Sequence, residues 1–354
     1  MNIYINGRFL LQKCTGVERF AYNMCKSFVS NGHNINIIIP KNGKIHNDYD
    51  VSQFNIKRFG VCSSHIWEQL VLPFFFIGKK DYVLLSFTGL GSILVPNKVM
   101  TIHDLSFLEN RNWFSAAYYH YYKLMTPLAV KTSRHIITVS NFSKDEILRF
   151  YRFLKPEQIT VVYNATDSNL FKPTKSEADA NSNYVLAVSS IDPRKNFAQL
   201  IKAFGNICNC TLKIVGAHNR VFNSSAKDSN IQQNKDNIEY LGRVTDKELV
   251  ELYSGAKAFI FPSLYEGFGL PPIEAMMCGC PVLVSDIPVL REICKDAAIY
   301  FNPKDAISIS SAIDSILLKE ENERNEIIQK GFENAKRFSW TKSVETLINT
   351  LSNL

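Results

Sequence analysis

The chain has 354 residues, which is long for one hydrophobic core and enough for two domains of ordinary size. Hydrophobic residues make up 46% and charged residues 21%, a globular composition that excludes a disordered or fibrous chain. The net charge is +7, but no Lys/Arg run with interleaved aromatic residues is present, so no nucleic acid partner is expected.

The positive charge is concentrated in the first half of the chain. Residues 1–170 hold 19 Lys and Arg and 11 Asp and Glu, a net +8, whereas residues 171–354 hold 21 and 22, a net −1. One interpretation is ordinary variation of surface composition. The other is that the first half faces an anionic surface, either acidic lipid headgroups or a phosphate-bearing acceptor.

The N-terminal sequence and the cysteines bear on the compartment. The opening "MNIYINGRFLLQ" is a short strand pattern followed by polar residues and does not predict a signal peptide. The most apolar run, residues 70–77, is far shorter than the ~20 residues that span a bilayer. The eight cysteines lack metal-ligand spacing and predict buried, reduced thiols. We therefore expect a cytoplasmic protein, at most peripheral on the inner face of the cell membrane.

Short apolar strands alternate with amphipathic helices through the first half, and the first helix is expected from about Val17. The strands are apolar throughout, as when helices cover both faces of a parallel sheet. Three possible capping boxes, at Thr15–Glu18, Ser143–Glu146 and Thr245–Glu248, mark these glutamates as caps rather than catalysts. Strands are predicted at residues 2–6, 35–40, 82–87, 98–104, 135–140 and 159–164.

A polar, turn-rich linker at residues 165–183 separates this pattern from a second one. The C-terminal residues are predicted to be helical, including a charged helix over 319–337, and these helices are expected to cross back to the first domain. Strands of the second pattern are predicted at residues 184–190, 211–216, 238–242, 258–263, 281–286 and 297–301.

These patterns predict an α/β fold with two doubly wound, Rossmann-like domains, residues 1–170 and 171–354. Doubly wound sheets bind ligands at the carboxyl ends of their strands. We therefore expect the two domains to face each other across a cleft that holds the ligand.

Residues 259–286, "FIFPSLYEGFGLPPIEAMMCGCPVLVSD", combine two acids with a glycine-rich turn at the start of a predicted helix. Glu266 precedes the turn, and Glu274 follows two prolines that suit the first helical positions. The amides and dipole of a helix N-terminus bind anions, whereas ionised carboxylates accept hydrogen bonds from vicinal hydroxyls. A nucleotide-sugar carries both phosphates and hydroxyls, and it fits this combination.

A basic pair, Arg194 and Lys195, follows the first strand of the second half in "SSIDPRKNFAQ". A strand–helix turn there would bring both side chains to the predicted cleft, where they could hold and neutralise a diphosphate. By itself the pair is equally compatible with a solvated loop.

Together these motifs resemble the family 4 glycosyltransferases of the GT-B fold, which are retaining and use nucleotide-sugars. The E-x7-E element in this context is the most specific of them. The resemblance covers nearly the whole chain, through "TGVERFA" (15–21), "TIHDLSF" (101–107), "HIITVSNFSKDEI" (135–147), "VVYNATD" (161–167), "DPRKN" (192–196), "YLGRVTDKEL" (240–249) and "EGFGLPPIEAM" (266–276).

The resemblance implies four catalytic residues. His103 would reach the donor sugar near its reacting face, and Glu266 would bind hydroxyls of the transferred sugar. Arg194 and Lys195 would bind the diphosphate leaving group. His103, which is followed by Asp104, can also be interpreted as a structural histidine at a strand end.

The resemblance also implies a set of donor-binding residues. Gly16 would lie close to the phosphates, the Val244 backbone near the base, and Glu274 on the ribose diol. The remaining positions lie in the glycine-rich turn, where backbone amides would meet the sugar and phosphates: Gly267, Phe268, Gly269 and Leu270.

The sequence departs from the family at one place and carries a motif of another fold at a second. Many members have Gly-Arg where this chain has Ser189-Ser190, so Arg194 is expected to replace the missing arginine. Asp48 and Asp50 form a DxD, a metal motif of the other major transferase fold, but they lie in a polar loop. We expect no metal ion and no cofactor.

The predicted function is a retaining, metal-independent transfer of a hexose from a nucleotide-sugar to a sugar hydroxyl of a lipid-linked oligosaccharide. The setting is bacterial surface polysaccharide assembly, such as the O-antigen of lipopolysaccharide, with GDP-mannose favoured over UDP-sugars. The alternatives are a nucleotide-sugar epimerase or hydrolase on the same fold, and a non-catalytic nucleotide-sugar-binding protein. The aromatic helix at residues 112–124 is expected to serve core and interdomain packing rather than to contact lipid.

Overall fold

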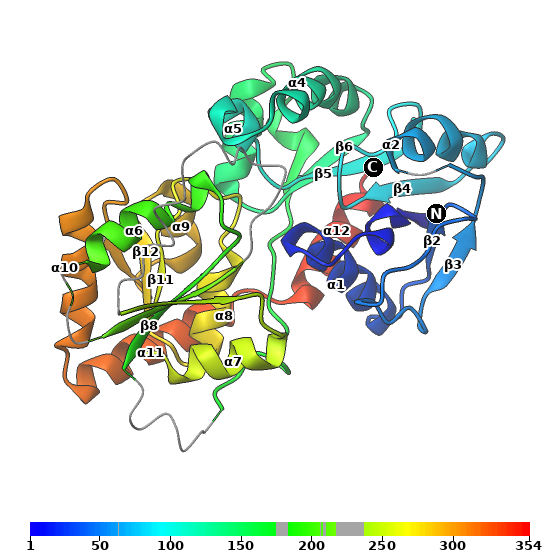
Figure 1. Cartoon of the computed structure of the whole chain (residues 1–354). Helices are drawn as coiled ribbons and strands as arrows, with labels where there is room; N and C mark the ends of the chain where they lie inside the picture. Colours follow the sequence, from blue (N-terminus) through cyan, green and yellow to red (C-terminus); the bar gives the residue numbers. More distant parts are fainter. Residues whose placement is uncertain (63, 175–182, 206, 208–209, 217–236) are drawn as a thin grey trace. The chain divides into compact units, whose positions relative to one another are not determined.

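The structure is a computed structural model that describes residues 1–62, 64–174, 183–205, 207, 210–216 and 237–354. The chain forms two compact units, each built on a parallel β-sheet (Figure 1). Unit 1 comprises Met1–Leu105, His120–Asn164 and Ser339–Leu354, and unit 2 comprises Ser106–Tyr119 and Ala165–Phe338. Residues 175–182 of the predicted linker lie outside the described residues.

Unit 1 is built on a seven-stranded sheet with the order β3-β2-β1-β4-β5-β6-β7. The order along the chain reverses between β1 and β4. In open α/β sheets this reversal opens a crevice at the carboxyl ends of the two strands. The strands are β1 (Asn2–Asn6), β2 (Ile35–Ile39), β3 (Asn55–Arg58), β4 (Tyr82–Ser86), β5 (Lys98–Ile102), β6 (His135–Thr138) and β7 (Ile159–Val161).

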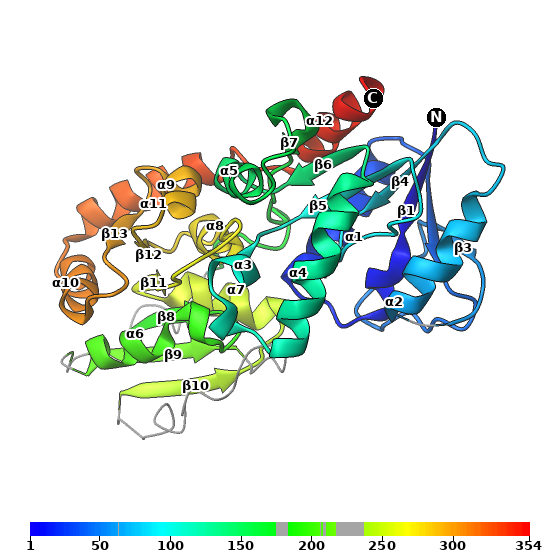
Figure 2. The same ribbon diagram turned by 90° about the horizontal axis from the view of Figure 1, so that it is seen from above.

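Two helices from opposite ends of the chain, α1 (Gly16–Ser30) and α12 (Trp340–Ser352), lie side by side in unit 1 (Figures 1 and 2). The rings of Phe20 and Trp340 meet edge to face, with centroids 5.8 Å apart. The Ser343 hydroxyl donates to the Tyr163 carbonyl oxygen at 2.7 Å. The C-terminal helix is therefore part of unit 1, although it follows unit 2 in sequence.

A second helical layer of unit 1 is the segment formed by α2 (Ser64–Ile66), η2 (Trp67–Val71) and η3 (Leu72–Phe76). Its hydrogen-bond pattern changes from α to π and then to 3₁₀. Trp67, Leu72 and Phe76 are buried and pack in one cluster with Tyr4 and Leu84 of the sheet. These buried side chains hold the segment against the sheet. The other helices of unit 1 are η1 (Gly7–Leu11), α5 (Asn141–Phe150) and η5 (Pro156–Gln158).

Unit 2 is built on a six-stranded sheet with the order β10-β9-β8-β11-β12-β13. The order along the chain reverses between β8 and β11, as it does between β1 and β4 in unit 1. The strands are β8 (Tyr184–Val188), β9 (Thr211–Val215), β10 (Ile238–Gly242), β11 (Ala258–Phe261), β12 (Val282–Ser285) and β13 (Ile299–Phe301).

Helices cover both faces of the sheet of unit 2 (Figure 1). On one face α6 (Phe197–Phe204) and α10 (Ala306–Leu317) contribute to a core cluster with strand residues such as Val185 and Ile260. On the other lie α7 (Asp246–Gly255), α8 (Leu270–Met277) and α11 (Glu321–Ala335). The unit also contains η7 (Pro193–Lys195), α9 (Pro288–Cys294) and, from the first half of the chain, α3 (Ser106–Glu109) and η4 (Arg111–Trp113).

The predicted strands are all present, and most of them are one to three residues shorter than predicted. Strand β3 was not predicted, because an edge strand with half-buried or exposed residues has no apolar run to mark it. The α/β prediction with two doubly wound sheets is confirmed.

Only one of the three predicted capping boxes is confirmed. The Thr245 hydroxyl accepts from the Glu248 amide and the Glu248 carboxylate accepts from the Thr245 amide. Helix α5 instead begins at Asn141, with Ser140 as its cap. The Thr15 hydroxyl donates to the carboxylate of Glu18 and makes no capping bond to the backbone.

The aromatic residues at 112–124, expected to serve core and interdomain packing, belong to a buried core only in part. Of these aromatic side chains only Phe114 is buried, whereas the others are half-buried. The helix itself, α4 (Ala116–Lys131), buries Thr126, Ala129 and Val130 near its C-terminal end. Among the described residues, no helix is long and apolar enough to cross a bilayer.

The position of α12 in unit 1 predicts which side chains of that helix hold the unit together. Leu347 is fully buried and Asn349 is exposed. Leu347→Ala should destabilise unit 1 by ~2–5 kcal/mol, because it removes buried apolar contacts and leaves a cavity. The matched Asn349→Ala should change the stability by less than ~0.5 kcal/mol. Urea unfolding followed by circular dichroism checks this, and equal midpoints for the two variants would contradict it.

Candidate active site

The reversal of strand order in unit 2 brings together the loops that follow β8 and β11. The Leu264 amide donates to the Arg194 carbonyl oxygen at 2.8 Å. The Asn196 side-chain amide donates to the carbonyl oxygens of Pro262, at 3.1 Å, and Pro303, at 2.7 Å. Asn196 itself has a left-handed backbone, with φ of 60°, a conformation that asparagine tolerates better than most residues. The two loops are therefore held as one structure.

The centre of this structure is an ion pair. Lys195 Nζ donates to Glu266 Oε1 at 2.5 Å, and both residues are buried, each with 8% of its surface exposed. The ammonium group also lies 5.5 Å from the centre of the Phe261 ring. A buried charge requires a partner, so each of these residues fixes the position of the other. Two residues that are 71 positions apart in sequence thus form one polar centre.

Arg194 lies beside this pair and is positioned by Asp192. The Asp192 carboxylate accepts from the Arg194 amide at 3.1 Å, and Arg194 Nε lies 3.7 Å from the same oxygen. The other carboxylate oxygen accepts from the Ser190 hydroxyl at 2.8 Å. Where many family members have an arginine, Ser190 therefore helps to fix the acid that orients Arg194.

Helix α8 begins directly after this centre, with Gly269 as its N-cap residue. Gly269 has φ of 94°, and a Cβ atom there would lie 2.7 Å from Leu290 Cδ2. A side chain at this position is strained by the left-handed backbone, and Leu290 would have to move to make room for it. Gly267 and Phe268 are buried, and the Phe268 ring packs edge to face on Phe338, with centroids 5.3 Å apart.

The second acid of the motif, Glu274, lies in α8 and is buried, with 7% of its surface exposed. The Tyr253 hydroxyl donates to Glu274 Oε2 at 3.3 Å. Burial, and secondly the negative charge of Glu274, raises the pKa of Tyr253 well above its ordinary value, so the phenol stays a donor. Sequence analysis did not find Tyr253, because it lies on α7 with no motif around it and meets Glu274 only in the folded unit.

Val244 lies apart from these residues within unit 2. It follows β10, the edge strand, which is separated from β8 by β9. The side chain is half-buried. Its place beside a nucleotide base stays a prediction.

In unit 1, His103 directly follows β5. Its imidazole contacts the backbone carbonyl of Phe87 and the ring of Phe20. Its Nε2 atom lies 2.9 Å from the Phe87 carbonyl oxygen, so this nitrogen carries the proton and donates it. The Phe20 ring meets the imidazole edge to face, with centroids 5.0 Å apart. Burial lowers the pKa of His103 below its ordinary value, only partly offset by the Phe87 carbonyl and Asp104. The imidazole is therefore neutral at neutral pH, with Nδ1 as an acceptor.

Gly16 is the first residue of α1 and is exposed. A Cβ atom at this position would meet nothing within 4 Å. The fold of unit 1 therefore does not require a glycine here. A requirement for glycine would have to come from a ligand that approaches the backbone.

The two acids of the predicted DxD are used in local contacts. Asp48 accepts from the Cys14 amide at 2.9 Å and lies 3.2 Å from His46 Nδ1. Asp50 accepts from the Ser52 amide at 3.0 Å, a bond that lowers the pKa of its carboxyl group. In the part of the chain that the structure describes, no group of three or more His, Cys, Asp or Glu side chains is arranged to hold a metal ion.

Comparison with known families agrees with this architecture. Residues 14–170 match the model described as Glycosyltransferase Family 4, and residues 169–334 match the model described as Glycosyl transferases group 1. The two matches meet at the end of the first predicted domain and together cover most of the chain. The chain belongs to the family 4 glycosyltransferases of the GT-B fold.

Curated relatives include O-antigen mannosyltransferases. The chain is 35% identical to the O-antigen chain mannosyltransferase RfbU of Salmonella typhimurium over 224 residues, which are 63% of this chain and 62% of that protein. It is 29% identical to the O-antigen chain mannosyltransferase B of Escherichia coli over 264 residues, 71% of this chain and 69% of that protein. The matched part is thus just under two thirds of the length of RfbU.

A solved structure supports the fold over the full length. The Anabaena protein HepE, crystallised in complex with UDP and glucose, superimposes with a TM-score of 0.75 at 18% identity, covering 100% of both chains. At this identity the likeness concerns the fold.

Two of the three predicted site glycines, Gly269 and Gly16, should respond differently to substitution. Gly269→Ala should destabilise unit 2 by at least ~1 kcal/mol, because it forces a side chain into a left-handed backbone and against Leu290. Gly16→Ala should leave unit 1 as stable as before, since its Cβ would be unopposed. Thermal unfolding of both variants checks this. An unchanged melting temperature for Gly269→Ala would contradict the described geometry of the α8 N-terminus.

Proposed function

We propose that the protein is a retaining, metal-independent mannosyltransferase. It transfers mannose from a nucleoside-diphosphate donor, GDP-mannose, to a sugar hydroxyl of a lipid-linked saccharide during assembly of a bacterial surface polysaccharide. Unit 2 binds the donor and unit 1 the acceptor. The observation that carries the proposal is the Lys195–Glu266 pair beside the N-terminus of α8. The names of the two O-antigen mannosyltransferase relatives support the choice of sugar.

The cations of unit 2 suit a diphosphate leaving group. Lys195 has three N–H donors, and the bond to Glu266 uses one of them. The others can bind phosphate oxygens together with the Arg194 guanidinium. The amides at the start of α8 add a positive dipole end. Groups fixed in advance stabilise the charge that develops on the leaving diphosphate without reorganising, so no metal ion is required for this step.

The acids suit the hydroxyls of the donor. Glu266 is fixed by Lys195 and binds hydroxyls of the transferred mannose, which places the sugar next to the cations that bind its phosphate. Glu274 binds the ribose diol. The hydrogen bond from the Tyr253 hydroxyl holds the Glu274 carboxylate in place. Carboxylates that already hold structural partners are better suited to orient a ligand than to attack it. This favours transfer over glycosidic hydrolysis by a carboxylate pair.

In unit 1, His103 contributes a neutral imidazole. Its Nε2–H is bound to the Phe87 carbonyl oxygen, so Nδ1 remains as an acceptor for a sugar hydroxyl. Retention of configuration then follows from a same-face reaction, in which the leaving phosphate takes the proton of the acceptor hydroxyl. That proton transfer needs no enzymic base.

The two acids provide the first test. Glu274→Ala should weaken GDP-mannose binding, and Glu266→Ala should mainly lower turnover. Each loses a hydrogen bond to a charged group, worth ~1.5–3 kcal/mol, or about 10- to 150-fold. The exposed Glu251 on α7 supplies the matched control, Glu251→Ala. Calorimetric titration and initial rates with GDP-mannose measure both effects, and wild-type kinetics in both site variants would refute the assignment.

Metal independence is tested separately. Transfer from GDP-mannose should proceed at the same rate in excess EDTA, because Arg194, Lys195 and the α8 amides supply the positive charge. Asp48→Asn with Asp50→Asn should likewise retain the activity. If EDTA instead abolishes the activity and manganese restores it, the hypothesis that Asp48 and Asp50 bind a metal ion is favoured.

A further inference from the structure

Unit 1 carries a group of exposed large hydrophobic side chains, most of them in or directly after the helical segment at residues 64–76 and two, Val61 and Leu94, in other loops. Three of them follow one another at intervals of four residues, and the next comes three residues later, so they lie on one side of the segment. The exposed fraction of each of these residues is between 59% and 73%. We call this group the apolar stripe: Val61, Ile66, Leu70, Phe74, Ile77 and Leu94.

The stripe cannot turn inward, because the other side of its segment is already buried. Trp67, Leu72 and Phe76 fill the core cluster against the sheet. The Trp67 indole also donates to the Phe59 carbonyl oxygen at 2.9 Å. Rotating the segment to bury Leu70 would expose these three side chains.

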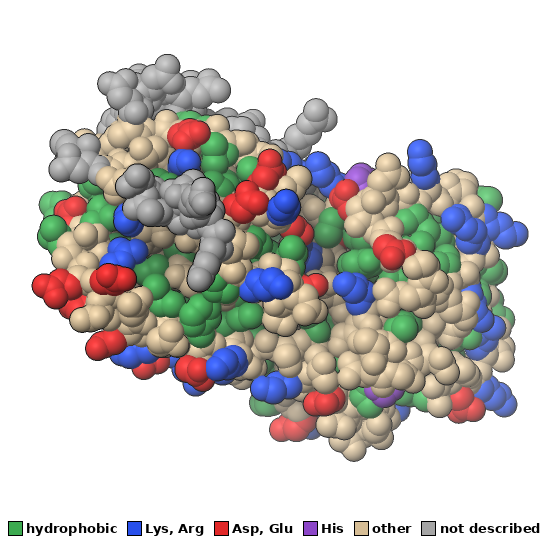
Figure 3. Space-filling model, turned by 90° about the horizontal axis from the view of Figure 1, so that it is seen from below, with side chains coloured by type: hydrophobic (Ala, Val, Ile, Leu, Met, Phe, Trp, Pro, Cys, Tyr) green, Lys and Arg blue, Asp and Glu red, His purple; other side chains and the backbone are tan. Residues whose placement is uncertain are grey.

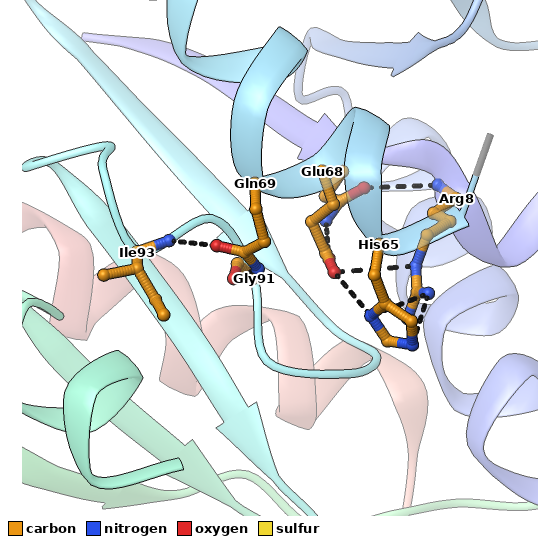
Figure 4. A network of polar contacts seen from close by, with 7 residues as sticks. Arg8, His65, Glu68, Gln69, Gly91 and Ile93 are labelled. Atoms are coloured by element: carbon orange, nitrogen blue, oxygen red, sulfur yellow. Dashed lines mark hydrogen bonds and ion pairs between the residues drawn. The ribbon is translucent and has the colours of Figure 1, made fainter. Parts of the chain in front are cut away.

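Polar anchors fix the segment in the same orientation (Figure 4). The buried Glu68 accepts from the Asn6 side-chain amide at 2.6 Å and lies 3.7 Å from Arg8 Nε. His65 approaches the same two charged side chains. Removing such partners from a buried carboxylate destabilises the folded protein, because the charge is then left buried and unpaired. Breaking this network to hide the stripe is therefore unfavourable.

Gln69 links the segment to the loop after β4, as Figure 4 also shows. Its side chain donates to the Gly91 carbonyl oxygen at 2.7 Å and accepts from the Ile93 amide at 2.9 Å. This holds Leu94 close to the residue after Gln69, Leu70. The stripe thus joins exposed side chains from two parts of the chain.

Positive charge borders the stripe. Lys79 and Lys80 follow Ile77 closely and are exposed. Lys79 Nζ lies 4.7 Å from the centre of the Phe75 ring, on the same segment. The acids nearest in sequence are Asp81, which is exposed, and the buried Glu68. In the view from below, Lys and Arg side chains are frequent along the outer edge of the part that contains unit 1, at the right of Figure 3.

We propose that the apolar stripe, with Lys79 and Lys80, is the surface through which unit 1 docks on an anionic lipid bilayer. Exposed aliphatic and aromatic side chains enter the headgroup boundary, and the lysines bind acidic headgroups. A second copy of the chain is a poorer occupant, because Lys79 and Lys80 of one copy would then face the same two lysines of the other, and like charges across an interface repel each other. The inference rests on the proposed function, because docking would bring unit 1 to the bilayer that holds the lipid-linked acceptor.

The test measures binding of the full chain to vesicles by co-sedimentation. Wild type should bind vesicles of phosphatidylglycerol and phosphatidylcholine, and bind vesicles of phosphatidylcholine alone at least ~10-fold more weakly. Leu70→Ser with Phe74→Ser, and Lys79→Glu with Lys80→Glu, should each reduce binding to the acidic vesicles at least ~10-fold. Salt should weaken the wild-type binding as the Debye length falls from ~10 Å at 0.1 M to ~3 Å at 1 M.

The matched control lies in unit 2. Ile307 and Leu318 are 74% and 84% exposed, and Ile307→Ser with Leu318→Ser should leave vesicle binding within ~2-fold of wild type, since the residues lie outside the stripe. All substituted side chains are exposed, so circular dichroism should show folded variants. Equal loss of binding in the control, or no binding by wild type, overturns the proposal.

Two further measurements separate the possible failures. Light scattering that shows a dimer, dissociated by Leu70→Ser with Phe74→Ser, would assign the stripe to a second copy and overturn the bilayer proposal. GDP-mannose binding in solution is measured on the same variants and should be unchanged. If GDP-mannose binds normally while vesicles do not, the docking surface is wrong and the proposed function stands. If vesicles bind but no nucleotide-sugar does, the proposed function is wrong and the docking surface stands.

Discussion

The ion pair between Lys195 and Glu266 is the interaction on which the rest of unit 2 depends. A buried ammonium group and a buried carboxylate are each unfavourable alone and acceptable only together. Because they come from the loops after β8 and β11, the pair requires these strands to be neighbours, which the reversal of strand order provides. The same pair places a cation and a hydroxyl acceptor beside the start of α8, where Gly269 allows the backbone to turn. One contact thus links the architecture of the two loops to the chemistry of the candidate site.

Unit 1 uses the same sheet architecture for a different purpose. Its polar residues near the carboxyl edge are held by the fold itself: His103 by the Phe87 carbonyl oxygen, and Glu68 by Asn6 and Arg8. Several large apolar residues are instead exposed in the apolar stripe. The two features are connected. The buried Glu68 carboxylate fixes the orientation of the segment, and this orientation leaves the apolar side chains exposed. This arrangement is compatible with the acceptor-binding and bilayer-docking roles proposed for unit 1.

The fold was largely predictable from the sequence, and the reasons are local. Strands such as β1 and β8 lie between helical layers, so their side chains are apolar on both faces and form continuous runs. Strand β3 escaped prediction because it lies at an edge and needs no such run. Helix starts were less predictable: Ser143 was predicted to cap α5, whereas Ser140 caps it and accepts a hydrogen bond from the Ser143 amide. The candidate site residues were predicted from motifs and from the family resemblance, whereas Tyr253 is brought to Glu274 only by the packing of α7 against α8.

The sequence by itself therefore determined the strands, the glycine-rich turn with its two acids, and the family to which they point. These depend on residues that are close together along the chain. The tertiary structure alone decided that Glu266 meets Lys195, that Glu274 meets Tyr253, and which side chains of the apolar run at residues 70–77 face outward. In sequence that run is uniformly hydrophobic. Packing against the sheet buries Leu72 and Phe76 and leaves Leu70, Phe74 and Ile77 exposed. The sequence could not show this division, because burial depends on partners that are distant in sequence.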